Sequence, residues 1–241
     1  MKNFTVITGA NSGIGRAIAL KAASSDYSLL LLDLKTNQIE KDLKNYQEVI
    51  FKKVDVTNYI EFEDAIKVGE KKFGPIKNMV NCAGIMNLER IDLQDVKTIV
   101  RQNEININGV IFGTKIALKS MLQHNFGTIL NIASIAGINI YANHADYVAT
   151  KFAIRGFSET VRAEVAEKGI RVALISPGIV KTNLLDGTTN LAIKKDYEDD
   201  RDKHDSFIEA KDIANTAFFI LEQPQKVTIR EIVICPTTQT N

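Results

Sequence analysis

The stretch NFTVITGANSGIG, residues 3–15, decides the fold of this chain. A β-branched run leads directly into a glycine-rich turn, after which Ile14, Ala17, Ile18 and Ala22 recur at helical spacing. Glycine permits a tight turn and a close approach of the backbone, and the free N–H groups of a helix N-terminus attract a diphosphate. The order of strand, glycine turn and helix therefore predicts a nucleotide-binding loop. The loop lacks the lysine of a Walker phosphate loop, which argues against nucleoside triphosphate hydrolysis.

A carboxylate stands where the next predicted strand ends. Residues 28–33, SLLLLD, have the pattern of a buried parallel strand that ends at Asp33, 18 residues after Gly15. In a dinucleotide-binding fold, an acid at about this distance binds the hydroxyls of the adenosine ribose. Because a carboxylate repels a 2′-phosphate, Asp33 favours NAD over NADP. Lys35 lies close by and leaves NADP open.

Strands and helices alternate along the rest of the chain. Further strands are expected at residues 49–56, 77–80, 127–133, 170–176 and 228–234, and helices at 59–73, 95–124, from before Tyr147 to about Lys168, and at 209–221. Such alternation implies a parallel sheet covered by helices on both faces. The sequence shows no repeat, linker or domain boundary. We therefore expect an α/β fold: a single-domain Rossmann-like doubly wound parallel sheet of about seven strands, spanning residues 1–241.

The composition excludes several classes of protein. Hydrophobic residues make up 45% and charged residues 24% of the chain, as in a soluble globular domain. The net charge of +1 gives no electrostatic footprint for nucleic acid. Cys82 and Cys235 lack metal-ligand spacing, and no apolar run approaches the roughly 18 residues of a membrane span. No signal-peptide core precedes the first strand. We expect a cytoplasmic protein without a metal site, nucleic-acid partner or membrane partner.

Residues 183–207 differ in composition from the rest of the chain, because Lys, Asp and Glu are dense and apolar residues show little periodicity. The segment follows the carboxyl end of a predicted strand, where α/β sheets bind ligands. Two interpretations are open: a solvated or disordered surface loop, and a lid over the substrate. The position favours the lid.

Tyr147 and Lys151 lie four residues apart, so that on a helix they share one face. A phenol has an ordinary pKa of about 10, and a neighbouring cation lowers that pKa. The pair therefore suggests a tyrosine that exchanges protons near neutral pH, with Lys151 as its activating cation. A Tyr and a Lys at this spacing also occur by chance on ordinary amphipathic helices, so the interpretation depends on the rest of the sequence.

Five motifs, in order along nearly the whole chain, resemble those of the short-chain dehydrogenase/reductase family. The family's glycine motif T-G-x-x-x-G-x-G stands at residues 8–15, and its N-N-A-G motif at residues 81–84, where Cys82 replaces the second asparagine and cannot reproduce its amide hydrogen bonds. Asn106 matches the family's helix asparagine better than Asn108 does. Ser134 lies 13 residues before Tyr147, as the family spacing requires, and residues 177–182, PGIVKT, resemble P-G-x-V-x-T.

The resemblance implies roles for four residues. Tyr147 would exchange a proton with the substrate oxygen while hydride passes to or from the nicotinamide ring. Lys151 would lower the pKa of Tyr147 and hydrogen-bond the nicotinamide ribose. Ser134 would hold the substrate oxygen, and Asn106 would position a water that relays protons beyond Lys151. The charge of an oxidised nicotinamide would be a second cation beside the phenol.

The resemblance also implies a cofactor-binding set and an assembly. The set is Gly9, Ser12, Gly13, Ile14, Gly15, Asp33, Asp55, Val56, Asn81, Ala83, Gly84, Tyr147, Lys151, Pro177, Gly178, Val180 and Thr182. Tyr141, His144 and Leu184 join Ser134 as candidate substrate contacts on position alone. A homodimer or homotetramer is implied, with contacts through the two long helices that carry Asn106 and Tyr147.

Together these observations predict an oxidoreductase that transfers a hydride between a nicotinamide cofactor, with NAD favoured, and a small secondary alcohol, ketone or 3-hydroxy acid. Residues 230–239 resemble family members that act on 3-hydroxy acids such as serine, although those prefer NADP. Two alternatives stay open: an NADPH-dependent 3-oxoacyl reductase, and a nucleotide-sensing protein of the same fold without turnover. The complete set of Asn106, Ser134, Tyr147 and Lys151 favours an enzyme over a sensor.

Overall fold

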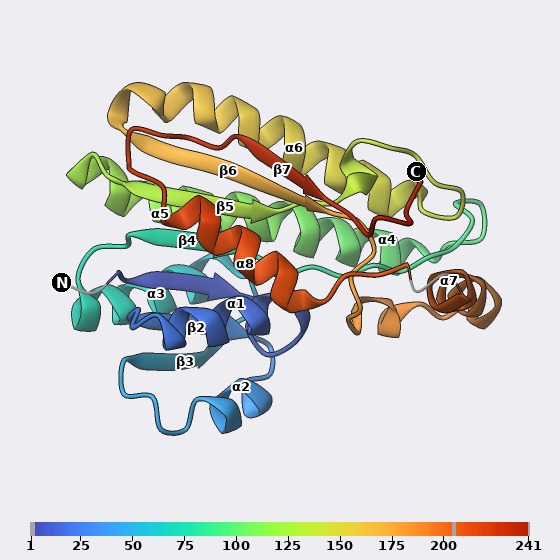
Figure 1. Ribbon diagram of the computed structural model, residues 1–241, viewed down its shortest axis with the longest axis horizontal. Helices are drawn as coiled ribbons and strands as arrows, with labels where there is room; N and C mark the ends of the chain where they lie inside the picture. The colour runs from blue at the N-terminus through green and yellow to red at the C-terminus, as the bar shows by residue number, and fades with distance from the viewer. Residues whose placement is uncertain (1–2, 204–205, 241) are drawn as a thin grey trace.

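Seven parallel strands form one sheet in the computed structural model, which describes residues 3–203 and 206–240 (Figure 1). The strands are β1 (Thr5–Thr8), β2 (Leu29–Asp33), β3 (Val49–Lys53), β4 (Asn78–Asn81), β5 (Gly127–Ile132), β6 (Ile170–Pro177) and β7 (Glu231–Ile234). Their order across the sheet is β3-β2-β1-β4-β5-β6-β7. The order reverses at β1 and β4, and such a switch point is where open α/β sheets bind ligands. The predicted fold class is confirmed.

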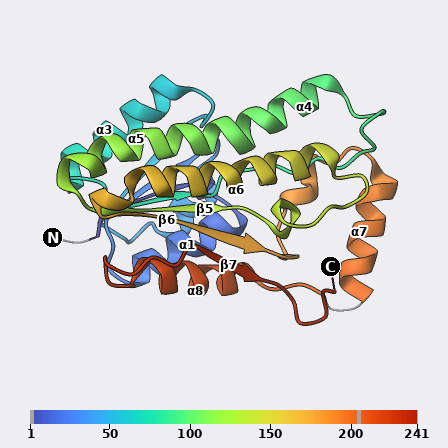
Figure 2. The same ribbon diagram turned by 90° about the horizontal axis from the view of Figure 1, so that it is seen from above.

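Helices cover both faces of the sheet (Figure 2). On one face lie α1 (Gly13–Ser24) and α8 (Ala210–Leu221), and on the other α3 (Tyr59–Phe73), α5 (Gly109–His124) and α6 (Ala145–Val165). The short helix α2 (Asn37–Asp42) follows β2. Because both faces are covered, the strands are apolar without alternation, and Leu29–Leu32 are fully buried. None of the helices in the described ranges is long and apolar enough to cross a membrane.

The long helical region predicted at residues 95–124 contains a π-helical turn. Helix α4 (Val96–Asn103) passes into the turn η1 (Glu104–Asn108), which continues directly into α5. A π turn widens the helix locally and is often found at functional sites. Asn106 lies within this turn and is 2% exposed.

Two stretches, residues 184–187 and 191–203, are helical within the segment 183–207, for which a loop was the alternative prediction. A short 3₁₀ turn, η4 (Leu184–Gly187), precedes α7 (Leu191–Lys203), which lies at the carboxyl end of the sheet (Figure 2). Ile193 and Tyr197, one helical turn apart, pack against the cluster that contains Tyr147 and Leu185. The loop interpretation is therefore wrong for the two helical stretches, whereas residues 188–190, 206 and 207 have no regular secondary structure. Residues 204 and 205 of the predicted segment lie outside the described part of the chain.

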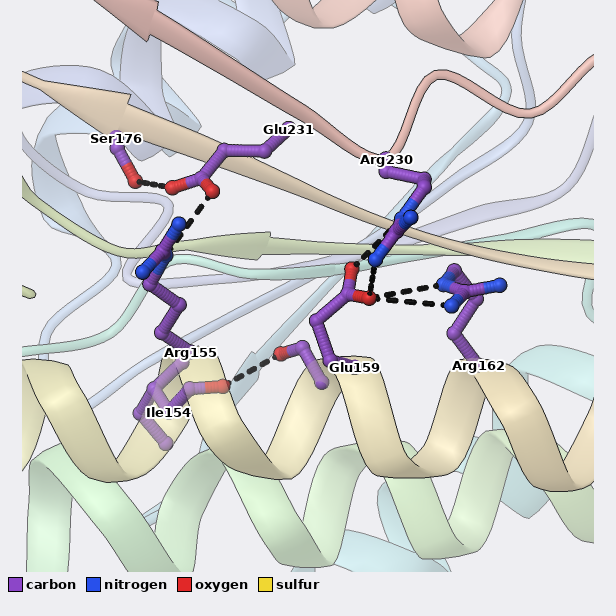
Figure 3. A network of polar contacts seen from close by, with 8 residues as sticks. Ile154, Arg155, Glu159, Arg162, Ser176, Arg230 and Glu231 are labelled. Atoms are coloured by element: carbon purple, nitrogen blue, oxygen red, sulfur yellow. Dashed lines mark hydrogen bonds and ion pairs between the residues drawn. The ribbon is translucent and has the colours of Figure 1, made fainter.

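Two ion-pair groups join the edge strand β7 and the residue before it to α6 (Figure 3). The carboxylate of Glu231 accepts hydrogen bonds from Ser176 Oγ at 2.7 Å and Arg155 Nε at 3.0 Å. Glu159 pairs with Arg230 and also with Arg162. Most of these groups are solvent-accessible, so we expect the pairs to align the edge strand rather than to add much stability. β7 begins at Glu231, so the strand is shorter than the predicted 228–234.

Candidate active site

A cavity of about 570 Å³ opens at the carboxyl edge of the sheet. Nearly all the residues predicted to bind cofactor or substrate line it: Gly9, Ser12, Gly13, Ile14, Gly15, Asp33, Asp55, Val56, Ala83, Gly84, Ser134, Tyr141, His144, Tyr147, Lys151, Pro177, Gly178, Val180, Thr182 and Leu184. They lie at the last residue of a strand or in the segments that follow β1 to β6, because the carboxyl ends of parallel strands meet at one edge. Asn81 and Asn106 are the two predicted residues outside this lining.

The glycine turn after β1 is built from close backbone contacts. Gly9 has a φ of +66°, and a Cβ there would lie 2.9 Å from the Cα of Ala83. A Cβ on Gly15 would lie 2.2 Å from the carbonyl oxygen of Gly9. Thr8 Oγ1 accepts hydrogen bonds from the N–H groups of Cys82 and Ala83, at 3.0 and 3.1 Å. The two glycines therefore let the turn pack closely against itself and against the segment after β4, and the turn leads into the N-terminus of α1 at the cavity. A glycine turn at a helix N-terminus fits a diphosphate.

The carboxylate of Asp33 is held at the cavity wall by backbone donors. Its Oδ2 accepts a hydrogen bond from Asn11 N at 3.0 Å, and its Oδ1 from Lys35 N at 3.1 Å. The Asn11 side chain in turn accepts hydrogen bonds from the N–H groups of Gln38 and Ile39 in the first turn of α2. Asn11 therefore links the glycine turn to the end of β2, a role that the sequence analysis did not assign.

Asp55 forms an ion pair at the cavity wall with Arg101 from α4. The carboxylate accepts hydrogen bonds from Thr57 N at 2.9 Å, Thr57 Oγ1 at 2.7 Å and Arg101 Nη2 at 2.8 Å. Desolvation opposes ionisation of Asp55, but these hydrogen bonds outweigh it and lower the pKa of the carboxyl. Arg101 also lines the cavity, so the ion pair forms part of its wall.

Tyr147 and Lys151 lie in the first two turns of α6, facing Ser134 at the end of β5. Lys151 Nζ is 5.5 Å from the centroid of the Tyr147 ring and donates a hydrogen bond to the carbonyl oxygen of Ile132 at 3.1 Å. Ser134 Oγ accepts a hydrogen bond from Ala136 N at 3.1 Å, which orients the serine. A phenol, a hydroxyl and an ammonium therefore converge on one cavity.

Burial controls the protonation of Tyr147 and Lys151. Desolvation raises the pKa of Tyr147, and a hydrogen bond with Ser134 opposes the rise only in part. Desolvation also lowers the pKa of Lys151 to about 8. In the protein alone, the cost of ionising a phenol that is 5% exposed dominates the pKa of Tyr147. The predicted lowering of this pKa by Lys151 stays a prediction.

Asn106 supports the site from behind the cavity. Its Oδ1 accepts a hydrogen bond from Ile85 N at 2.9 Å, and its Nδ2 donates to Ile85 O at 2.9 Å and to Thr150 Oγ1 at 3.2 Å. Thr150 Oγ1 donates to the carbonyl oxygen of Tyr147 at 2.7 Å. The amide thus joins the segment after β4 to the turn of α6 that carries Tyr147. The predicted relay through Asn106 stays a prediction.

Asn81 lies inside the sheet layer rather than at the cavity. Its Nδ2 donates hydrogen bonds to Asn131 Oδ1 at 2.8 Å and Thr114 Oγ1 at 3.2 Å, whereas its Oδ1 is buried without a hydrogen-bond partner among the described residues. The adjacent backbone of Cys82 and Ala83 does reach the cavity. Asn81 therefore links β4 to its neighbours in the fold, and its predicted cofactor contact stays a prediction.

The substrate end of the cavity is mainly aromatic and apolar. The hydroxyl of Tyr141 is buried and has no hydrogen-bond partner among the residues that the structure describes. His144 lies between Tyr141 and Tyr197, with ring centroids 5.7 and 6.2 Å away. Burial lowers the pKa of His144. Its Nδ1 lies 2.6 Å from the carbonyl oxygen of Ala142, so the proton of the neutral ring resides on Nδ1 and Nε2 is left as an acceptor.

The comparison with known protein families decides the affiliation. The family model described as short chain dehydrogenase matches residues 3–191. The chain belongs to the short-chain dehydrogenase/reductase family. Uncharacterized oxidoreductases of Staphylococcus saprophyticus and Staphylococcus aureus are both 32% identical, over 236 and 234 residues, and in each case the match covers 96% of both chains. These relatives support an oxidoreductase.

Solved structures of this family have the same fold. An alcohol dehydrogenase from Thermococcus sibiricus, complexed with 5-hydroxy-NADP, superposes with a TM-score of 0.88 at 24% identity and covers 100% of this chain and 99% of its own. ElxO with NADP bound superposes with a TM-score of 0.85 at 27% identity, over 97% of this chain and 98% of its own. The first likeness shows the fold alone, and both agree with the doubly wound sheet.

Several residues of this dehydrogenase/reductase site were missed by the sequence analysis. They are Met86, Arg101, Leu185, Tyr197, Arg201 and Gln239, all of which line the cavity. They belong to none of the recognised motifs, and no sequence signal pointed to them apart from the position of Leu185, Tyr197 and Arg201 in the expected lid. In the described part of the chain, no group of three or more His, Cys, Asp or Glu side chains is placed to hold a metal ion.

Proposed function

We propose that this oxidoreductase transfers a hydride between a nicotinamide dinucleotide and a small secondary alcohol, ketone or 3-hydroxy acid, with Tyr147 as the general acid and base. The observation that carries the proposal is the convergence of Ser134, Tyr147 and Lys151 on the cavity that the glycine turn also lines. The glycine turn at the N-terminus of α1 and the carboxylate of Asp33 suit the diphosphate and ribose of such a cofactor.

The chain's own residues would donate and accept the proton, whereas the bound cofactor supplies the hydride chemistry. In carbonyl reduction, Ser134 would hold the substrate oxygen and Tyr147 would donate its proton to that oxygen. The raised pKa of Tyr147 keeps the phenol protonated and so suits this direction. In alcohol oxidation, Tyr147 must accept the proton as a phenolate, which positive charge from Lys151 and an oxidised nicotinamide would stabilise.

We propose NAD as the preferred cofactor, and the position of Asp33 supports it. The carboxylate lines the cavity after β2 and would repel a 2′-phosphate. NADP is the second candidate, because ElxO, at 27% identity, is a structural neighbour with NADP bound. The dissociation constants of NADH and NADPH should be measured on the same preparation. Tighter binding of NADPH would overturn our interpretation of Asp33.

We propose that the segment of about residues 183–207 acts as a lid over the substrate. Leu184, Leu185 and Tyr197 line the cavity from this segment. Thr188 Oγ1 ties it to the loop after β4, since it accepts a hydrogen bond from Leu88 N and donates one to Met86 O, both at 3.2 Å. The lid would exclude water from the reacting groups.

We further propose that the chain works as one catalytic domain in a cytoplasmic homodimer or homotetramer. Exposed apolar residues on the long helices support the assembly: Val100 on α4 is 50% exposed, Leu122 on α5 is 42% and Phe152 on α6 is 43%. Sedimentation of the purified protein measures its mass in solution, and a monomer would contradict the proposal.

The experiment that tests the proposed reaction is a screen of small alcohols, 3-hydroxy acids and ketones, followed by the absorbance of the reduced nicotinamide. We expect turnover with at least one alcohol and ketone pair. Tight dinucleotide binding without turnover of any compound would instead favour a nucleotide sensor.

A further inference from the structure

The segment that follows β7 folds back to the cavity. Gln239 lines the cavity, and its side-chain Oε1 accepts a hydrogen bond from the backbone N–H of Ile179 at 3.0 Å. The segment is held in place on both sides of this contact: Gln239 N donates to Pro236 O at 3.0 Å, and Thr238 Oγ1 lies 2.7 Å from Ser206 Oγ. A residue 60 positions away therefore fixes the turn after β6.

Gly178 makes room for this side chain. A Cβ at Gly178 would lie 2.1 Å from Gln239 Oε1 and 3.0 Å from Cys235 Sγ. The glycine is needed here for the close approach, since Gly178 is not among the glycines with positive φ. The sequence PG at residues 177–178 and the glutamine at 239 thus form one packed unit.

The turn at residues 178–180 is held from two directions. Ile179 O accepts a hydrogen bond from Ile208 N at 2.9 Å, and Val180 forms a parallel bridge with Ile208. The N–H of Ile179 is bound by Gln239. Because Oε1 of Gln239 already accepts the hydrogen bond from Ile179, Nε2 is the side-chain atom that is left to donate a hydrogen bond. No hydrogen bond from Nε2 to any described residue is present.

We propose that Gln239 is a positioning residue for the nicotinamide half of the cofactor. Its Oε1 fixes the Gly178–Val180 turn, and its Nε2 supplies a hydrogen-bond donor to the carboxamide oxygen of the nicotinamide. This inference rests on the proposed function, since it takes the turn after β6 to border the nicotinamide. It adds a recognition residue from a part of the chain that contains none of the five motifs.

Binding measurements with the dinucleotide and with ADP-ribose test the proposal, because ADP-ribose lacks the nicotinamide. Gln239→Leu removes both the acceptor and the donor while keeping a side chain of similar length. We expect it to weaken binding of the reduced dinucleotide about tenfold or more and to change ADP-ribose binding less than about twofold. The control Gln47→Leu alters an exposed glutamine before β3 and should change neither constant.

Gln239→Glu distinguishes a residue beside the ring from a merely structural one. The carboxylate keeps the acceptor for Ile179 but replaces the donor with a negative charge. The oxidised nicotinamide ring is positive and the reduced ring is neutral, so the ratio of their affinities should shift at least about threefold toward the oxidised cofactor. An unchanged ratio would overturn the proposed proximity.

Gly178→Ala disturbs the contact between Gln239 and the turn after β6 without changing Gln239 itself. Its Cβ would expel the Gln239 side chain, so we expect the same selective loss of dinucleotide binding. The double variant Gly178→Ala/Gln239→Leu should lose less than the sum of the single losses in binding free energy. Equal weakening of ADP-ribose and dinucleotide, or no weakening of either, would overturn the inference. Failure of the unaltered protein to bind any nicotinamide dinucleotide would overturn the proposed function together with it.

Discussion

Lys151 Nζ lies 5.5 Å from the centroid of the Tyr147 ring, and its hydrogen bond goes to the carbonyl oxygen of Ile132. Both side chains are buried, at 8% and 5% exposure. Each group therefore disfavours its charged form: the pKa of the amine falls to about 8, and that of the phenol rises. The phenol of Tyr147 is therefore neutral at neutral pH, and it lies beside the amine of Lys151, whose pKa is about 8.

Replacement of Lys151 by Met should stabilise the protein and abolish turnover. The pKa of Lys151 falls to about 8 on folding. When this lysine is protonated, it therefore lowers the free energy of unfolding by a few kcal/mol, on the order of 1.4 kcal/mol for each pKa unit. This destabilisation is fully present below pH 8 and is relieved as the pH rises toward the unfolded pKa of about 10.5.

Urea unfolding at pH 7 and pH 9.5 measures this effect. Lys151→Met should raise the free energy of unfolding by about 1–3 kcal/mol at pH 7, and the gain should shrink at pH 9.5. Exposed Lys44→Met, between α2 and β3, is the matched control and should show no such trend. A gain of the same size at both pH values would show that Lys151 does not titrate in this window.

Replacement of Tyr141 by Phe separates stability from substrate recognition. The hydroxyl is buried without a described partner, so its removal should leave the free energy of unfolding unchanged or raise it by about 1 kcal/mol. If this hydroxyl binds a polar group of the substrate, kcat/KM should fall about tenfold in the same variant. A stable variant with unchanged kcat/KM would remove Tyr141 from the substrate site.

Limited proteolysis tests the lid. We expect cleavage within residues 183–203 to slow when cofactor and substrate are both bound, because closure orders the segment. Thr188→Ala removes the hydrogen bonds to Met86 and Leu88 and should speed cleavage of the unliganded protein. The exposed turn at residues 44–45, between α2 and β3 and away from the cavity, serves as an internal reference site. Cleavage of 183–203 that ligands leave unchanged would contradict the lid.

The fold could be predicted because its signals are local. The strand, glycine turn and helix at residues 3–24, and the apolar strands after it, need only neighbouring residues to be recognised. The observed sheet follows from them because parallel strands require helical crossovers. The π turn around Asn106 gave no such signal, since it depends on the contacts of that amide with Ile85 and Thr150.

The candidate site could be predicted only in part. The motif residues meet at one cavity as expected, but Arg101 and Gln239 reach it through long-range contacts with Asp55 and Ile179. The protonation of Tyr147 could not be predicted from its spacing to Lys151, because desolvation depends on the packed structure around the ring. The many charged residues of α7 hid its helical periodicity, in which the hydrophobic residues Ile193 and Tyr197 pack inward one turn apart.

Replacement of Tyr147 by Phe tests the central claim most directly. The variant keeps the ring and loses only the proton that the mechanism requires. We predict that kcat falls at least about 10³-fold while the dissociation constant of the dinucleotide changes less than about threefold, and that the control Tyr59→Phe on α3 retains activity. Turnover by Tyr147→Phe at the rate of the unaltered protein would contradict the assignment of Tyr147 as the general acid and base.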